Sequence, residues 1–153
     1  MRVRLKRWSL AGLAGLAVIG GLALRPAEGE ELAVVWKSRT CGCCKLWVQH
    51  LEAHGFRVEA RDVEDLSAKK RQLGVPPAME SCHTAEIGGY LVEGHVPAED
   101  VRRLLAEKPA VRGIAAPGMP VGSPGMEVPG QKPDPYEVIA FTPDGKTRVF
   151  TRH

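Results

Sequence analysis

The hydrophobic positions along the chain predict a series of short strands and helices that begins near residue 32. Leu32–Trp36 is a continuous apolar run with the length of a buried strand. From Cys44, apolar residues recur at the i, i+3, i+4, i+7 spacing of an amphipathic helix, with Thr40 as the expected N-cap and Gly55 as its end. Phe56–Val63 alternates apolar with charged residues, which predicts a half-buried strand.

The rest of the pattern predicts two further helices and two hairpins. We expect helices over Asp65–Leu73 and Pro97–Leu105, and hairpins that join Thr84–Ile87 to Tyr90–Val92 and Glu137–Phe141 to Thr147–Thr151. Glycine pairs and Pro-Asp-Gly turns support both hairpins. Up to residue 105 the order is β-α-β-α-β-β-α, which is the order of a thioredoxin-like α/β core. We therefore predict a mixed central sheet flanked by helices, followed by a C-terminal β-hairpin.

Between the third helix and the last hairpin, Pro109–Pro135 has no hydrophobic periodicity. After Pro109 it carries six prolines and five glycines, and it also holds Met119 and Met126. A loop of this length inside one domain is usually functional or disordered. We expect it to be a long irregular Gly/Pro/Met loop.

The N-terminal segment differs from the remainder of the chain. Basic residues cluster between positions 2 and 7, and the uncharged run Ser9–Leu24 follows them. This arrangement predicts that residues 1–27 are a signal peptide or an N-terminal anchor, and that residues 32–153 form one domain. The expected location is the periplasm or another exported compartment. A membrane contact is expected only through the N-terminal segment, if that segment stays uncleaved.

Net charge changes sign once this segment is set aside. The formal charge is +3, but five of the 21 basic residues and none of the 18 acidic ones lie in the first 27 positions. The predicted domain therefore has no basic excess, and we expect no nucleic-acid partner.

Cysteines supply the strongest chemical signal. Cys41, Cys43 and Cys44 lie within four residues, directly before the first helix, and Cys82 precedes His83. Sulfur ligands concentrated in this way favour a thiophilic metal or thiol chemistry. Cys41 and Cys44 also have the C-x-x-C spacing that, at a helix N-terminus, stabilises a thiolate. In an oxidising compartment disulfides would form unless a metal or a reductant prevents them, and three pairings are open.

Histidines and methionines extend the set of candidate ligands. By its place before the third strand, the Cys82-His83 pair is expected to face the Cys41 turn, as the corresponding segment does in glutaredoxin-like folds. His95 follows the hairpin and borders the same region. Met119 and Met126 offer thioethers, which select Cu(I) over Zn(II). The alternative is a packing role for Cys82 and the methionines and a surface position for both histidines. His50 and His54, one turn apart on the first helix, have the spacing of a metal-ligand pair, but we expect them on its solvent face.

Several segments together resemble the CopG-type copper-resistance family. They are Thr40–Cys44, Asp62–Leu66, Gly74–Pro77, Ser81–Ala85, Gly88–Tyr90, Glu93–Pro97, Pro117–Pro120 and Gly122–Glu127. The family consists of small exported bacterial proteins with a thioredoxin-like fold, long catalogued as a domain of unknown function. The resemblance covers residues 32–153.

That resemblance implies copper handling in the periplasm. By position, Cys41, Cys43, Cys44 and Cys82 correspond to thiolate ligands of Cu(I), and a multi-copper cluster is one form that the site can take. His83, His95, Met119 and Met126 correspond to additional ligands. The implied partners are copper ions and other periplasmic copper-handling proteins.

Three functional hypotheses follow. The first is a copper-binding protein of copper resistance, which the third cysteine and the methionine loop favour. The second is a thiol-disulfide or copper oxidoreductase, with Cys41 as nucleophile and Cys44 as resolving thiol. The third is a structural zinc site, which the crowded spacing of the cysteines favours least.

Overall fold

Strands and helices are interspersed through residues 31–153, the part of the chain that the computed structural model describes. The elements are β1 (Leu32–Lys37), α1 (Gly42–Ala53), β2 (Arg57–Asp62), α2 (Leu66–Leu73), the 3-10 turn η1 (Pro77–Met79), β3 (His83–Ile87), β4 (Tyr90–Gly94), α3 (Ala98–Glu107), β5 (Gly113–Ala116), β6 (Glu137–Phe141) and β7 (Thr147–Arg152). The predicted signal or anchor, residues 1–27, lies outside these residues. Within residues 31–153, no helix combines the length and the apolar character needed to cross a bilayer.

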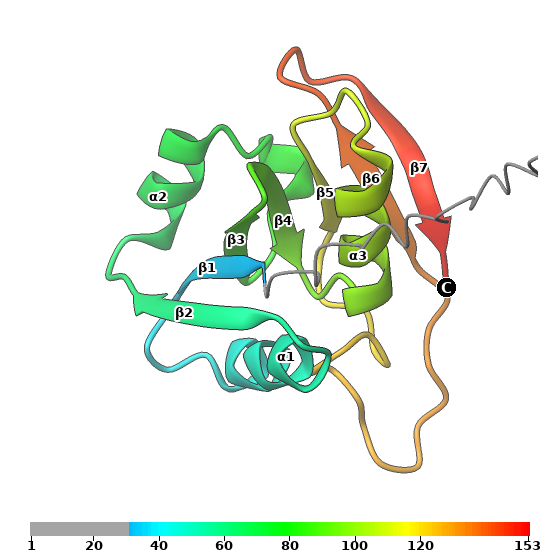
Figure 1. Ribbon diagram of the computed structural model, residues 1–153. Helices are drawn as coiled ribbons and strands as arrows, with labels where there is room; N and C mark the ends of the chain where they lie inside the picture. The colour runs from blue at the N-terminus through cyan, green and yellow to red at the C-terminus, as the bar shows by residue number, and fades with distance from the viewer. Residues whose placement is uncertain (1–30) are drawn as a thin grey trace, which may run out of the picture.

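The strands form one mixed sheet. Across residues 31–153 its seven strands lie in the order β2-β1-β3-β4-β5-β6-β7. The β1–β2 and β4–β5 pairs are parallel and the others are antiparallel. Each parallel pair is joined through a helix, α1 in the first case and α3 in the second (Figure 1). This arrangement confirms the predicted α/β class and fits a thioredoxin-like fold.

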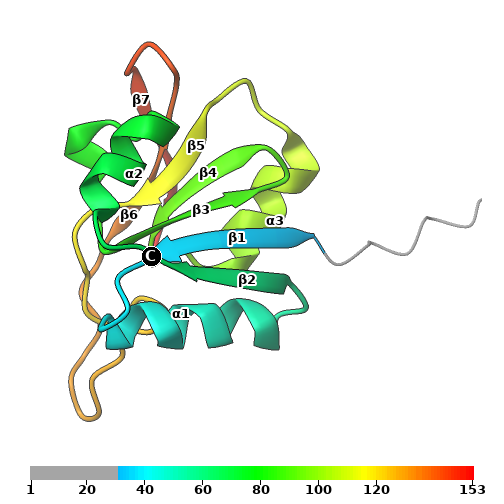
Figure 2. The same cartoon turned by 90° about the vertical axis from the view of Figure 1, so that its left-hand side faces the viewer.

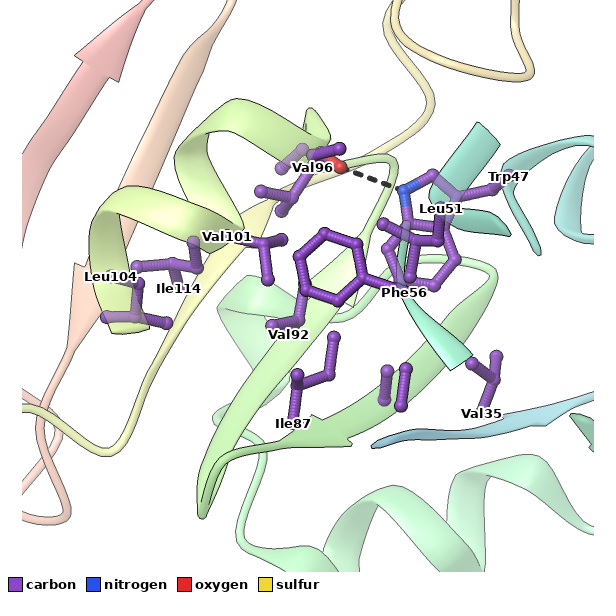
Figure 3. Packing of buried hydrophobic residues seen from close by; sticks show 14 of the residues in the cluster. Val35, Trp47, Leu51, Phe56, Ile87, Val92, Val96, Val101, Leu104 and Ile114 are labelled. Carbon is purple, nitrogen blue, oxygen red and sulfur yellow. Dashed lines mark hydrogen bonds between the residues drawn. The ribbon is translucent and has the colours of Figure 1, made fainter. Parts of the chain in front are cut away.

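Helices cover the two faces of the sheet unequally. On one face α1 and α3 pack over the main core, which includes Trp47, Leu51, Val101 and Leu104 (Figure 3). On the other face α2 and η1 cover a smaller cluster of Val75, Leu91, Ala115 and Phe141, with Leu73 and Met79 at its margin. Figure 2 shows α2 and α3 on opposite sides of β3 and β4. Side chains that alternate along β3 and β4 therefore enter two different environments.

Trp47 locks α1 against the segment that leads into α3. Its side chain is fully buried, and Nε1–H donates a hydrogen bond to the Val96 carbonyl oxygen over 2.9 Å (Figure 3). A buried indole needs such an acceptor, because an unpaired N–H in the core would be costly. The contact fixes where the N-terminus of α1 lies relative to the end of β4.

Three local predictions were wrong. The segment Pro109–Pro135 was expected to be irregular throughout, but it contains β5, whose four residues are all buried. A strand buried on both faces has no alternation to reveal it. Phe56–Val63 was expected to be a half-buried strand, but β2, which covers Arg57–Asp62, is an edge strand and mostly exposed. The N-cap of α1 is Cys41 and not Thr40.

Candidate metal centre

The turn between β1 and α1 presents three cysteines. Cys41 has extended backbone angles, and its Sγ accepts the backbone N–H of Cys44 at 3.3 Å. The sulfur therefore takes the place that an oxygen usually occupies at an N-cap, and it lies at the positive end of the helix dipole. Cys41 and Cys44 form a disulfide in this structure, which leaves Cys43 and Cys82 as the free thiols among residues 31–153.

Cys82 reaches this turn because of the strand register. β1 ends at Lys37 and β3 begins at His83, and these two residues are partners in the antiparallel ladder. The segment before β3 therefore lies beside the segment after β1. Cys43 Sγ lies 3.5 Å from Cys41 Sγ and 3.9 Å from Cys82 Sγ. The sulfurs of Cys41, Cys43, Cys44 and Cys82 all lie within 4.8 Å of one another.

Burial controls the ionisation of Cys82. Loss of solvent, with a further contribution from Cys43, raises the pKa of Cys82 to about 12. At neutral pH this residue is a thiol, and a metal that binds its sulfur must displace the proton.

His95 extends the sulfur cluster on the side of β4. Its Nδ1–H donates a hydrogen bond to the Pro124 carbonyl oxygen over 2.8 Å, because a carbonyl can only accept. In the neutral ring Nε2 then carries the lone pair, which lies 2.9 Å from Cys82 Sγ and accepts the thiol hydrogen. Burial lowers the pKa of His95, which favours this neutral form. Many metal-binding histidines are oriented by such a hydrogen bond from the second ring nitrogen to a carbonyl.

His83 completes the group from the main core side of β3. Its ring is fully buried, 4.3 Å from the Trp47 ring and 5.0 Å from the His95 ring between centroids. Nδ1 lies 3.3 Å from Cys82 Sγ, while Nε2 has no hydrogen-bond partner among the described residues. Burial, followed by the charges of His95 and Lys70, lowers the pKa of His83 well below its ordinary value. A neutral, buried imidazole whose Nδ1 lies against a cysteine sulfur suits a metal ligand.

The donor set therefore consists of two overlapping groups. Four cysteine sulfurs form the first, and Cys82, His83 and His95 form the second, with donor atoms also within 4.8 Å of one another. Cys82 belongs to both. Thiolates and imidazoles together fit a soft or borderline transition metal such as copper.

The methionine loop borders the site. Ser81 Oγ donates a hydrogen bond to the Gly118 carbonyl oxygen, which holds the start of the loop beside the Cys82 segment. Met119 follows directly and is 54% exposed. Figure 2 shows the loop after β5 beside the N-terminal end of α1. Met126, half buried, follows Gly125, which contacts the α1 backbone.

His50 and His54 of α1 were expected on the solvent face of the helix, but the structure places them in a partly buried position. Both are half buried, their ring centroids are 4.2 Å apart, and His50 Nε2 accepts the backbone N–H of Ala98 at 3.1 Å. His50 therefore caps the start of α3. It is not in the cluster of candidate metal ligands. The Pro124 carbonyl that orients His95 was not anticipated, because sequence carries no signal for a single backbone contact of this kind.

Fold and site together define an α/β protein in which a helix-terminal turn with three cysteines faces a fourth cysteine and two buried histidines. The chain is 48% identical to two solved structures, titled copper resistance protein CopG form 2 and form 1. They match over 80% of this chain and 98% and 96% of theirs, with TM-scores of 0.76 and 0.75. The family described as "Protein of unknown function, DUF411" matches residues 79–126. Comparison with curated proteins finds no match. The chain belongs to the family of CopG copper resistance proteins, as the resemblance predicted.

Proposed function

We propose that this protein binds Cu(I) in the periplasm and serves copper resistance. Cys41, Cys43, Cys44 and Cys82 supply thiolates, and His83 and His95 supply imidazoles. The observation that carries the proposal is the convergence of four sulfurs within 4.8 Å of one another, beside the buried imidazole of His83, whose Nδ1 lies 3.3 Å from Cys82 Sγ. The printed names of the two solved relatives support copper as the metal.

The chemistry of the ligands favours the cuprous ion. Thiolates are soft donors that select Cu(I), and four of them close together can bridge several ions in one cluster. Neutral imidazoles add donors without adding charge to a buried site. Met119 and Met126, on the loop beside the cluster, are proposed as further ligands that supply thioethers from the outer side of the site.

The disulfide defines the state that can bind copper. A disulfide sulfur is a poor ligand, so an external dithiol reductant must first convert Cys41 and Cys44 to thiols, supplying two electrons and two protons and becoming a disulfide itself. Copper then displaces the thiol protons. Reduced protein is therefore the competent form, and oxidised protein retains only Cys43 and Cys82 as cysteine ligands.

The proposed location and partners are supported by the N-terminal sequence and by the chemistry of the metal. The basic cluster and the uncharged run at residues 1–27 support export to an oxidising compartment. Cysteines in such a compartment form disulfides unless a metal or a reductant prevents it. Other periplasmic copper-handling proteins are the proposed source and destination of the copper.

A thiol-disulfide or copper oxidoreductase is the second candidate. The Cys41–Cys44 disulfide at the N-terminus of α1 favours it, because the dipole and the free N–H groups there stabilise an attacking thiolate. In this alternative Cys41 is the nucleophile and Cys44 resolves the mixed disulfide.

Cys43→Ser distinguishes the two candidates, because it removes one sulfur of the cluster and leaves the C-x-x-C pair intact. The experiment measures Cu(I) uptake by anaerobically reduced protein with a competing chelator, and ligation by X-ray absorption. We expect sulfur-dominated ligation in the wild type and weaker binding in Cys43→Ser, with thiol-disulfide exchange retained. Cys41→Ser should abolish exchange. Unchanged stoichiometry and affinity in Cys43→Ser would refute its role as a ligand, and a wild type without Cu(I) binding would refute the proposed function.

A further inference from the structure

An ion pair is buried on the opposite face of the sheet from His83. Lys70 of α2 is 2% exposed, and Glu93 of β4 and Thr84 of β3 are fully buried. Thr84 and Glu93 are partners across the β3–β4 ladder, and Lys70 forms an ion pair with Glu93. Neither Lys70 nor Glu93 belongs to the groups of candidate metal ligands.

The Glu93 carboxylate holds one short segment at both ends. Oε1 accepts the backbone N–H of Ser81 at 2.6 Å and also a hydrogen bond from Lys70 Nζ. Oε2 accepts the hydroxyl of Thr84, and Thr84 Oγ1 in turn accepts from Lys70 Nζ at 2.9 Å. Ser81 and Thr84 are the residues immediately outside Cys82 and His83. The two candidate ligands therefore lie on a segment that a single carboxylate fixes on either side.

Glu93 also connects the Ser81–Thr84 segment to His95, because it lies at the end of β4 that leads to His95. Glu93 is two residues before His95, and Gly94 between them has a φ of +72°. A Cβ atom at Gly94 would lie 2.6 Å from Ser81 Cβ and 2.7 Å from the Ala116 carbonyl oxygen. The end of β4 and the segment before β3 are thus in direct contact, with Glu93 as the polar link between them.

Stability alone is a weak reason for such a pair. Removing two charges from water is expensive, and well-packed apolar residues in their place are often neutral or stabilising. A carboxylate at this site does what an apolar side chain cannot, because it accepts hydrogen bonds from both ends of the Ser81–Thr84 segment.

We propose that Glu93 is a positioning residue of the metal centre. It holds Cys82, His83 and His95 as one unit facing the cysteines of α1, and Lys70 is its buried counter-charge. This inference rests on the proposed copper function for its metal-binding consequence. It also has a consequence in the metal-free protein, where Cys82 is held 2.9 Å from His95 Nε2.

Two double variants separate positioning from stability. Lys70→Met with Glu93→Leu removes both charges and the anchor while it keeps the apolar volume. Lys70→Met with Glu93→Gln removes the charges but keeps an amide oxygen that can accept the Ser81 N–H. Asp100→Asn is the matched control, because Asp100 is also buried, at 3% exposure, and accepts hydrogen bonds from Thr151 and His153 away from the site.

Cu(I) affinity is measured in all variants by chelator competition, together with Tm and X-ray absorption. We expect the Leu double variant to bind Cu(I) about 10–100-fold more weakly, the usual effect of losing a group that orients ligands. The nitrogen contribution to the absorption spectrum should also fall. The Gln double variant should recover most of the affinity, and Asp100→Asn should keep wild-type affinity whatever its Tm. Wild-type affinity and ligation in the Leu double variant would overturn the proposal.

A metal-free readout keeps this inference distinct from the proposed function. In oxidised protein, mass spectrometry follows alkylation of Cys82 relative to Cys43, the two free thiols. We expect Cys82 to react faster in the Leu double variant than in the wild type, even if the protein were to bind no copper. An unchanged ratio would contradict the positioning role. Should the double variants fail to fold, Thr84→Val removes one end of the anchor alone and is judged by the same ratio.

Discussion

Gly125→Ala should disturb the candidate metal centre through the loop whose Pro124 carbonyl oxygen accepts a hydrogen bond from His95. Gly125 has a φ of +83°, and a Cβ atom there would lie 2.8 Å from the Cys43 carbonyl oxygen and 2.9 Å from the Trp47 backbone nitrogen. Both atoms belong to the helix backbone and cannot rotate away. The loop itself must therefore move from α1, and it would take the neighbouring Pro124 carbonyl with it.

Gly130 offers a matched control for the size of this effect. Its φ is +78°, nearly the same, but a Cβ atom added there would meet no other atom within 4 Å. Alanine in the left-handed region costs about 1–2 kcal/mol, and this cost applies to both variants. Gly125→Ala adds the displacement of the loop and the loss of the His95–Pro124 hydrogen bond, which is worth about 1 kcal/mol or more when the buried partner stays unpaired.

Thermal unfolding of metal-free protein compares the two variants directly. For a domain of this size, 1 kcal/mol corresponds to a shift of roughly 4 °C in Tm. We expect Gly125→Ala to lose about 4 °C or more beyond Gly130→Ala, and the imidazole NMR signals of His95 to change in Gly125→Ala alone. Equal Tm shifts and an unperturbed His95 in both variants would show that the loop does not pack on α1 as described.

Three further predictions concern the scaffold of the site. Burial, followed by the charge of His54, lowers the pKa of His50 below 6.5, so the folded state binds fewer protons than the unfolded state and stability should fall as the pH drops below that value. As the pH is lowered through this range, the Tm of His50→Asn should decrease less than the Tm of the wild type. Equal decreases would show that His50 does not cause this loss of stability. Trp47→Phe leaves the Val96 carbonyl without its partner, so chemical denaturation should show a loss of about 1–3 kcal/mol, against little change for an exposed Leu46→Ala. Asp65→Ala removes the side-chain N-cap of α2 and should lower the free energy of unfolding by about 1 kcal/mol in the same measurement. Asp65→Asn should keep most of the wild-type stability, because asparagine also caps helices well.

Sequence could predict the elements that carry strong periodicity or strong turn residues. Helix α1 and the two hairpins were found from these signals alone, and the position of the Cys41 turn followed from them. Strand β5 was missed because Gly113–Ala116 is short, made mostly of small residues and buried on both faces. The close approach of β5 to β4 explains the glycine, since a Cβ atom at Gly113 would collide with the Leu91 carbonyl oxygen.

The polar contacts around the ligands were less accessible to sequence reasoning. Lys70 stands between Lys69 and Arg71 on a charged helix, and nothing in the sequence marks it as the buried one. Glu93, after the apolar pair Leu91-Val92, breaks an otherwise hydrophobic strand, and this was a signal that a buried acid lies there. The partners of Glu93 can be identified only from the structure, in which the β3–β4 register pairs it with Thr84 and α2 brings Lys70 to the same face.

Cys43 bears most directly on the choice between exchange chemistry and copper binding. Its Sγ lies 3.5 Å from Cys41 Sγ, so it is as well placed as a resolving thiol to attack any disulfide formed at Cys41. Exchange rates depend on which thiol is close and ionised, and two competing resolving thiols would divide the products between two intramolecular disulfides. A soft metal has no such conflict, because neighbouring thiolates can bind or bridge Cu(I) ions together. The same crowding that complicates a dithiol exchange enzyme therefore favours the proposed Cu(I) site. Cys82 and its two neighbouring histidines add candidate ligands that disulfide exchange does not require.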